Sequence, residues 1–229
     1  MKNAAKNPIE SITPFTLLDF PDQTACILWF AGCNMNCKYC YNPEIVNSKG
    51  KLSYDNALKF LKTRIGLLDG VVLSGGECTT AYGFVDFVEQ IKGLGFSVKI
   101  DTNGSAPWIL EELVKRNLID YVALDFKALQ KKYFEITASK LFHRFQKSMK
   151  FLIESKLTFE IRTTVHGDLL GLEDVRVMKQ FIYDNGYRGI YYIQHFINDT
   201  PTIGSMKSNT LKIKAEDFKE DGSRIQIRN

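Results

Sequence analysis

The sequence predicts an α/β fold, a partial (βα)6 barrel of the TIM type that is open on one side. Apolar strand-like runs alternate with helical patterns along most of the 229 residues. Such alternation implies right-handed parallel crossovers, and the six strand-helix units fall short of the eight that close a full barrel. Polar motifs also recur at the ends of the predicted strands, where α/β proteins place their chemistry.

The predicted strands are β-branched, aromatic and aliphatic runs, and the first lacks polar alternation, as is typical of a strand buried on both faces of a parallel sheet. They cover residues 24–32, 71–74, 96–101, 121–126, 158–165 and 189–194. Between them, apolar residues recur at helical spacing in residues 54–65, 84–94, 107–114, 131–155 and 172–182. Pro107 opens one of these helices at a position that suits its missing N–H.

No linker or internal repeat interrupts this pattern, so we expect one domain over residues 1–229, with a core of about 14–200 and a tail over 201–229. The tail ends in a short strand-like segment, RIQIRN. Near the N-terminus we expect four apolar side chains to pack in the core, because such residues are most often buried: Phe15, Leu17, Leu18 and Phe20.

The composition excludes several classes of protein. Hydrophobic residues make up 45% and charged residues 24%, the profile of an ordinary globular chain. The net charge of +4 is mild and its Lys and Arg are spread along the chain, so nucleic acid binding is not indicated. No apolar run approaches the roughly 20 residues of a membrane span, and the first ten residues lack the apolar centre of a signal peptide. We therefore expect a cytoplasmic protein without membrane contact.

Three of the five cysteines, Cys33, Cys37 and Cys40, lie within eight residues directly after the first predicted strand. Their spacing allows three thiolates to bind one metal centre and leaves one coordination position open. An iron-sulfur cluster with a free iron is one interpretation. A zinc site completed by a fourth ligand is another, with these candidates: Cys26, Cys78, His166 and His195. A redox pair of Cys37 and Cys40 is a third, which the extra cysteine disfavours.

The pattern CNMNCKYC, with Tyr39 before the last cysteine, followed by SGGE, resembles the signature of radical S-adenosylmethionine (radical SAM) enzymes. The resemblance implies a four-iron cluster on the three cysteines, S-adenosylmethionine bound to its free iron, and a 5′-deoxyadenosyl radical as product. It places Tyr39 beside the adenine. Gly75 and Gly76 would let the backbone approach the cofactor, and Glu77 would accept a hydrogen bond from its ammonium group. Cys78 stands where the family usually has proline; we expect Cys78, like Cys26, to be structural.

A closer resemblance runs through PFTLLDFP, the cysteine loop, SGGE, DTNG, YVALDFKA and IQIRN. Together these segments are similar to the activases of anaerobic ribonucleoside-triphosphate reductase, which resemble pyruvate formate-lyase activating enzymes. The resemblance implies that the chain generates a glycyl radical on that reductase, with a flavodoxin or ferredoxin-type protein as electron donor. It also assigns further residues to the cofactor's surroundings: Asp101, Asp125, Lys127, Arg162 and His195. Asp101 and Asp125 would in addition hold a monovalent cation.

Two alternatives stay open at this point. A small-molecule enzyme such as 7-carboxy-7-deazaguanine synthase shares the cysteine and GGE motifs in a chain of similar length. A non-catalytic zinc-binding module would use the cysteine loop for structure alone. For individual residues, a surface ion pair would explain Asp125 and Lys127, and local hydrogen bonds would explain His195. His143 and His166 match no motif.

Overall fold

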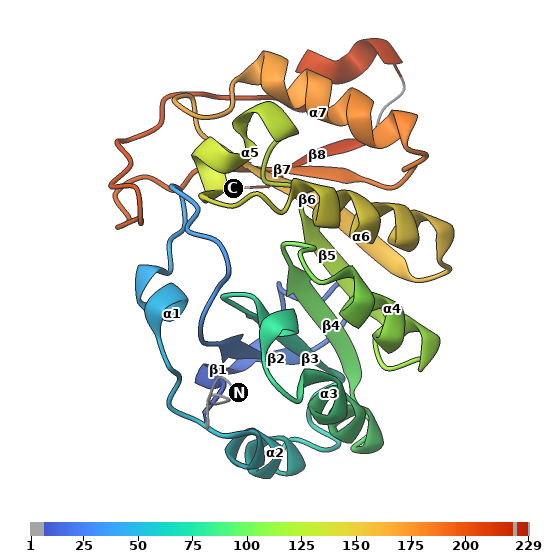
Figure 1. The fold of residues 1–229 in the computed structure, drawn as a ribbon. Helices are drawn as coiled ribbons and strands as arrows, with labels where there is room; N and C mark the ends of the chain where they lie inside the picture. The colour runs from blue at the N-terminus through green and yellow to red at the C-terminus, as the bar shows by residue number, and fades with distance from the viewer. Residues whose placement is uncertain (1–6, 222–223, 229) are drawn as a thin grey trace. The chain divides into compact units, whose positions relative to one another are not determined.

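Figure 1 shows a computed structural model of the chain, which describes residues 7–221 and 224–228. The strands of the described residues form one mixed sheet in the order β1 to β8. They are β1 (Ile9–Thr16), β2 (Ala25–Phe30), β3 (Gly70–Gly75), β4 (Ser97–Thr102), β5 (Tyr121–Asp125), β6 (Thr158–Val165), β7 (Tyr191–His195) and β8 (Ile225–Arg228). The α-helices are α1 (Pro43–Asn47), α2 (Tyr54–Lys62), α3 (Phe84–Gly93), α4 (Pro107–Lys115), α5 (Gln130–Thr137), α6 (Phe142–Glu154) and α7 (Leu172–Asp184), and two 3-10 helices are η1 (Cys78–Thr80) and η2 (Ala215–Asp221).

The six predicted strands are confirmed as β2 to β7, and the strand-like end of the tail is β8. The structure adds one strand that the sequence analysis did not predict. β1 pairs antiparallel with β2, which makes the sheet mixed. The predicted helical stretch 131–155 is two helices, because Ala138 adopts a left-handed conformation (φ 53°) that ends α5.

The backbone forms two compact units. The first comprises residues 7–34, 44–102 and 106–122. In it β2, β3 and β4 are parallel neighbours, with Ala25 opposite Gly70 and Gly70 opposite Ser97. β2 and β3 carry almost continuous buried residues, as strands covered on both faces require. Aromatic side chains fill the space between β2 and α3: the Phe30 and Phe84 rings meet edge to face with centroids 5.4 Å apart.

The second unit comprises residues 35–43, 103–105, 123–221 and 224–228. In it β6, β7 and β8 are parallel neighbours, with Ile161 opposite Tyr191 and Tyr191 opposite Ile225. Its core contains stacked rings of Phe126 and Phe145, with centroids 4.8 Å apart. β5 ends in this unit. The prediction that both units belong to one folding domain stays a prediction.

One prediction about the core is wrong. Phe20 is buried, but Phe15, Leu17 and Leu18 are 53%, 64% and 93% exposed. The pairing of β1 with β2 is irregular between Thr13 and Thr16. The turn that follows is closed on itself by hydrogen bonds of the Thr16 side chain, so these apolar side chains project outward.

No helix in the described part of the chain combines the length and the apolar composition that a membrane span requires. Residues 1–6, on which part of the signal-peptide prediction rested, and Asn229, the last residue of the IQIRN motif, lie outside the described residues.

Candidate cofactor site

The cysteine loop follows β2, as predicted, and divides between the two units. Cys33 belongs to the first, whereas Cys37 and Cys40 belong to the second. None of the three forms a disulfide, and neither do Cys26 and Cys78, both of which are buried. The Cys40 amide donates to the Cys37 carbonyl at 2.9 Å and closes a tight turn between them. Cysteine thiols on one loop are the ligands that iron-sulfur clusters take, so the chemistry of the donor set fits the implied cluster. Within the described part of the chain, no three Cys, His, Asp or Glu side chains are gathered closely enough to hold a metal ion, so the cluster ligands stay a prediction.

The loop is attached to the second unit by its backbone. The amides of Asn36 and Lys38 donate to the carbonyls of Thr137 and Ile136, at the C-terminus of α5, each at 2.9 Å. These bonds satisfy carbonyl groups that a helix end leaves without partners. Cys37 is thereby buried, and burial raises the pKa of its thiol to about 11, an effect that the nearby Lys127 ammonium partly offsets.

Tyr39 lies inside the second unit with 4% of its surface exposed. The Lys127 ammonium lies 5.7 Å from the centre of its ring, within the range of a cation–π contact. The Tyr39 hydroxyl is buried and has no hydrogen-bond partner among residues 7–221 and 224–228. A buried hydroxyl without a partner costs free energy, so a polar ligand group beside it would satisfy it. This observation fits the cofactor that the sequence implies.

The two glycines of SGGE permit a close approach between backbones. Gly75 has φ +115°, and a Cβ added there would lie 2.4 Å from the Phe30 amide nitrogen. A Cβ on Gly76 would lie 1.8 Å from the Gly32 carbonyl oxygen. In the same turn, the Gly76 amide donates to the Phe30 carbonyl at 2.8 Å and the Glu77 amide donates to the Gly32 carbonyl at 2.9 Å. These glycines therefore join the SGGE turn to the start of the cysteine loop, and their contact with the cofactor stays a prediction.

Glu77 is buried with 1% of its surface exposed, and its carboxylate is held by threonines. Its Oε1 accepts from the Thr79 hydroxyl at 2.5 Å, the Thr79 amide at 3.3 Å and the Thr102 hydroxyl at 2.7 Å. Sequence reasoning missed both threonines. Thr102 had a signal, since it belongs to the DTNG motif at the end of β4. These bonds fix the orientation of the carboxylate before any ligand binds.

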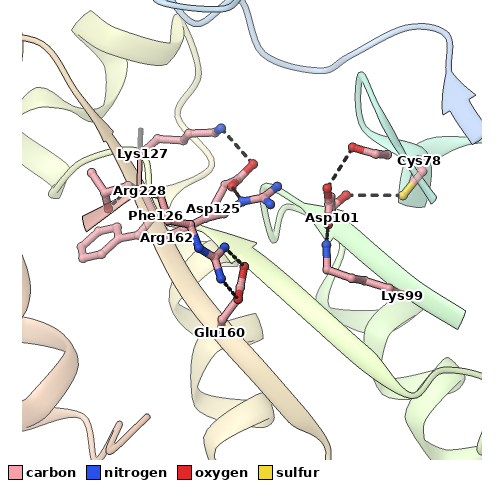
Figure 2. Close-up of polar contacts among 11 residues, drawn as sticks. Cys78, Lys99, Asp101, Asp125, Phe126, Lys127, Glu160, Arg162 and Arg228 are labelled. Carbon is pink, nitrogen blue, oxygen red and sulfur yellow. Dashed lines mark hydrogen bonds and ion pairs between the residues drawn. The ribbon is translucent and has the colours of Figure 1, made fainter. Parts of the chain in front are cut away.

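Asp101, at the end of β4, pairs with the ammonium of Lys99 (Figure 2). The Ser74 hydroxyl, from the SGGE motif, donates to the other carboxylate oxygen at 3.0 Å. The Cys78 thiol shares its single proton between the backbone carbonyls of Leu73 and Asp101, each 3.6 Å from the sulfur. Cys78 thus links the ends of β3 and β4 inside the first unit, which supports its structural role. Lys99 was missed by the sequence analysis.

Asp125 and Lys127 form a partly buried ion pair, with the ammonium 3.0 Å from Oδ2 (Figure 2). Arg162 on β6 donates from Nε to Oδ1 at 2.5 Å. The side chains of Asp125, Lys127 and Arg162 are 22%, 17% and 16% exposed, so the alternative of a surface ion pair does not describe them. Burial alone would lower the pKa of Lys127, but the Asp125 carboxylate and the Tyr39 and Cys37 side chains hold it well above its ordinary value.

The segment after β7 runs along the cysteine loop within the second unit. The amides of Ile203 and Gly204 donate to the carbonyls of Cys40 and Lys38, at 3.3 and 2.8 Å. A side chain on Gly204 would lie 2.8–3.0 Å from Lys38, so this close approach needs glycine. The Tyr41 hydroxyl also accepts from the Ile197 amide at 2.7 Å. We call residues 196–213 the tail strap.

Two histidines bind the tail strap. His195, predicted near the cofactor, has its Nε2 3.0 Å from the Ile213 carbonyl. His166 has its Nε2 2.9 Å from the Lys207 carbonyl, and its Nδ1 accepts from the Asp168 amide. Both ring nitrogens of His166 are therefore engaged, so it is unsuited to be the fourth ligand of a zinc ion. Local hydrogen bonds explain His166, as the lack of a motif suggested.

Comparison with known proteins decides the family. The model of the radical SAM superfamily matches residues 27–181 of the chain. The chain belongs to that superfamily. A protein of Methanocaldococcus jannaschii that bears the name "putative glycyl-radical enzyme activating enzyme" is 30% identical over 198 residues, which are 82% of this chain and 79% of that protein. The pyruvate formate-lyase-activating enzyme of Clostridium pasteurianum is 34% identical over 126 residues, 52% of each chain.

Within the superfamily, this radical SAM protein belongs to the glycyl-radical enzyme activating enzymes, and the predicted resemblance is confirmed at that level. The superfamily implies a [4Fe-4S] cluster and S-adenosylmethionine.

Solved structures support the fold. Streptococcus suis SuiB bound to S-adenosylmethionine matches with a TM-score of 0.62 and 18% identity over 80% of this chain and 44% of that chain. The protein anSMEcpe with bound AdoMet matches with a TM-score of 0.60 and 17% identity over 73% of this chain and 49% of that one. The radical SAM chain spans about half the length of these proteins. The predicted α/β class with an open, partial barrel is confirmed by this likeness.

Proposed function

We propose that this radical SAM protein reductively cleaves S-adenosylmethionine and generates a glycyl radical on anaerobic ribonucleoside-triphosphate reductase. The observation that carries the proposal is the similarity to a glycyl-radical enzyme activating enzyme over 82% of the chain. Features of each unit support it: a cysteine loop without disulfides, a fixed carboxylate at Glu77 in the first unit, and in the second a buried Tyr39 hydroxyl without a partner among the described residues all suit a charged, polar cofactor.

When bound, the cluster and cofactor supply the electron transfer and the carbon radical that removes hydrogen from a glycine Cα. The protein's own residues bind and orient these groups. Cys33, Cys37 and Cys40 are the proposed cluster ligands, and Tyr39 would lie beside the adenine. Glu77, on its glycine turn, would accept a hydrogen bond from the cofactor's ammonium.

The charged residues of the second unit provide the rest of the proposed cofactor surroundings. Lys127 and Arg162, held by Asp125, present positive charge that suits a carboxylate. His195 is proposed to contribute to the cofactor surroundings by holding the tail strap, to which its ring is hydrogen-bonded. We infer that the monovalent cation predicted near Asp101 and Asp125 is not required there, because each carboxylate already pairs with a cation of the protein.

We infer a protein substrate, with a flavodoxin or ferredoxin-type protein as electron donor. None of the five cysteines forms a disulfide, which suits a reducing compartment, and we propose the cytoplasm.

The deciding experiment is electron paramagnetic resonance on the reductase after anaerobic incubation with this protein, reductant and S-adenosylmethionine. A glycyl radical signal is expected. If cofactor cleavage occurs without that signal, the reductase assignment is wrong and a small-molecule enzyme such as 7-carboxy-7-deazaguanine synthase becomes the better candidate.

A second experiment separates the enzyme from a zinc-binding module. Anaerobic reconstitution with iron and sulfide should produce the cluster, and the reduced protein should form 5′-deoxyadenosine. Cys37→Ala should abolish both, whereas Cys26→Ala, which removes a buried cysteine outside the loop, should retain both. Stoichiometric zinc with no cluster spectrum would reject the enzymatic proposal.

A further inference from the structure

In the first unit, the buried Lys99 forms an ion pair with Asp101. Lys99 is 2% exposed, and its ammonium pairs with Asp101 Oδ1, while the Asp101 side chain is 12% exposed (Figure 2). A buried ammonium is strongly destabilising unless a carboxylate and further hydrogen bonds compensate it. The charge of Lys99 is therefore tied to this carboxylate and is not a surface charge.

The strand itself explains the pairing. Successive side chains on a β-strand point to opposite faces, so Lys99 and Asp101, two residues apart on β4, share one face. On the neighbouring strand β3, the Ser74 hydroxyl donates to the second carboxylate oxygen. The Asp101 carboxylate thus has an ammonium on one oxygen and a hydroxyl on the other, both supplied by the first unit.

In the second unit, Asp125 is paired in a comparable way. Its two oxygens accept from Lys127 and Arg162, at 3.0 and 2.5 Å. Two cationic side chains of the protein, Lys127 and Arg162, therefore pair with the one Asp125 carboxylate. Each of the two carboxylates predicted to hold a monovalent cation already has its charge matched from within its own unit.

We propose that Lys99 is the resident cation of Asp101, a positioning residue that takes the place of a monovalent metal ion and makes cofactor binding independent of sodium and potassium. An alkali ion at Asp101 would have to displace the ammonium or lie beside it, where two like charges repel. The inference rests on the proposed function in that it concerns the surroundings of the same cofactor.

The wild-type protein provides the first test. Its thermal midpoint and, after reconstitution, its affinity for S-adenosylmethionine are measured in sodium, potassium and choline chloride at equal ionic strength. Choline is too large for a small carboxylate site. The expected result is the same midpoint and affinity in all three salts. A saturable rise of either quantity in sodium or potassium but not in choline would overturn the proposal.

Substitution of Lys99 provides the second test. Lys99→Met leaves Asp101 without its buried partner, and in choline we expect the thermal midpoint to fall by about 10 °C. Potassium or sodium should restore part of that loss. The matched control is Lys92→Met, which removes a lysine whose pair with Asp120 is partly exposed and should shift the midpoint by less than about 4 °C. A folded Lys99→Met variant that is indifferent to alkali ions would contradict the proposal.

The double variant Lys99→Met with Asp101→Asn covers the case in which the single variant fails to fold. It removes both charges, so it should fold and should not respond to alkali ions. A double variant that sodium or potassium stabilises relative to choline would refute the assignment of the cation to Asp101. The midpoints need neither cluster nor partner, so this inference can fail while the glycyl radical still forms, and the reverse also holds.

Discussion

Replacement of Gly76 by alanine tests the joint between the SGGE turn and the cysteine loop. The added Cβ would lie 1.8 Å from the Gly32 carbonyl oxygen and 2.6 Å from its carbon. Because real Cβ contacts stay above 3.0 Å, the two backbones must separate by at least 1.2 Å, the difference between 3.0 and 1.8 Å. The hydrogen bond from the Glu77 amide to the Gly32 carbonyl, 2.9 Å long, would not survive that movement.

The expected cost combines two terms. Overpacking costs about 1–3 kcal/mol, and the lost hydrogen bond adds about 1 kcal/mol. We therefore expect Gly76→Ala to lower the free energy of unfolding by about 2–4 kcal/mol, measured by urea denaturation of the metal-free protein. At about 2–4 °C per kcal/mol for a chain of this size, the thermal midpoint should fall by about 4–16 °C.

The matched control is Gly93→Ala at the end of α3. Nothing lies within 4 Å of a Cβ added there. Alanine is the better helix former, so this variant should be unchanged or more stable by about 0.5–1 kcal/mol. If Gly76→Ala unfolds at the same urea concentration as wild type, the close backbone contact does not limit this turn and the reasoning is refuted.

Three further predictions concern separate parts of the chain. Arg228→Ala removes a bidentate ion pair, with bonds of 2.9 and 3.1 Å, from the buried Glu160 and should lower the free energy of unfolding by about 2–4 kcal/mol in urea denaturation. The control Arg176→Ala removes an exposed ion pair with Glu173 and should lower it by less than about 1 kcal/mol. Equal losses in the two variants would contradict this prediction. Burial raises the pKa of the Cys26 thiol to about 12, so above the unfolded value of about 8.5 the unfolded chain loses this proton first and stability falls as pH rises. Cys26→Ala should make that fall shallower between about pH 9 and 11, and an unchanged slope of urea midpoints would argue against it. Gly204→Ala should loosen the tail strap and speed amide hydrogen exchange in residues 196–213, while unchanged protection there would show that the strap tolerates a side chain.

Local patterns in the sequence determined much of the fold. Six strands were predicted because buried parallel strands are continuous apolar runs, and they correspond to β2–β7. β1 was missed because its sequence, IESITPFT, mixes polar residues and a proline with apolar ones. Its exposed Phe15 shows why an apolar residue is a weak predictor of burial: pairing register decides which way a side chain points, and register is set by the partner strand.

The sequence by itself determined the family of this radical SAM protein and predicted its site residues, since the cysteine loop, SGGE and the two strand-end aspartates are short motifs whose spacing alone is informative. Only the tertiary structure decided which groups neutralise and orient those motifs. The ion pairs of Lys99 with Asp101 and of Arg162 with Asp125 form because of which strand faces are buried and which strands lie near each other. The tail strap on the cysteine loop joins residues more than 150 positions apart, as in the bond between Ile197 and Tyr41. Burial and long-range pairing arise only when distant parts of the chain come together, so they cannot be predicted from the local periodicity of the sequence.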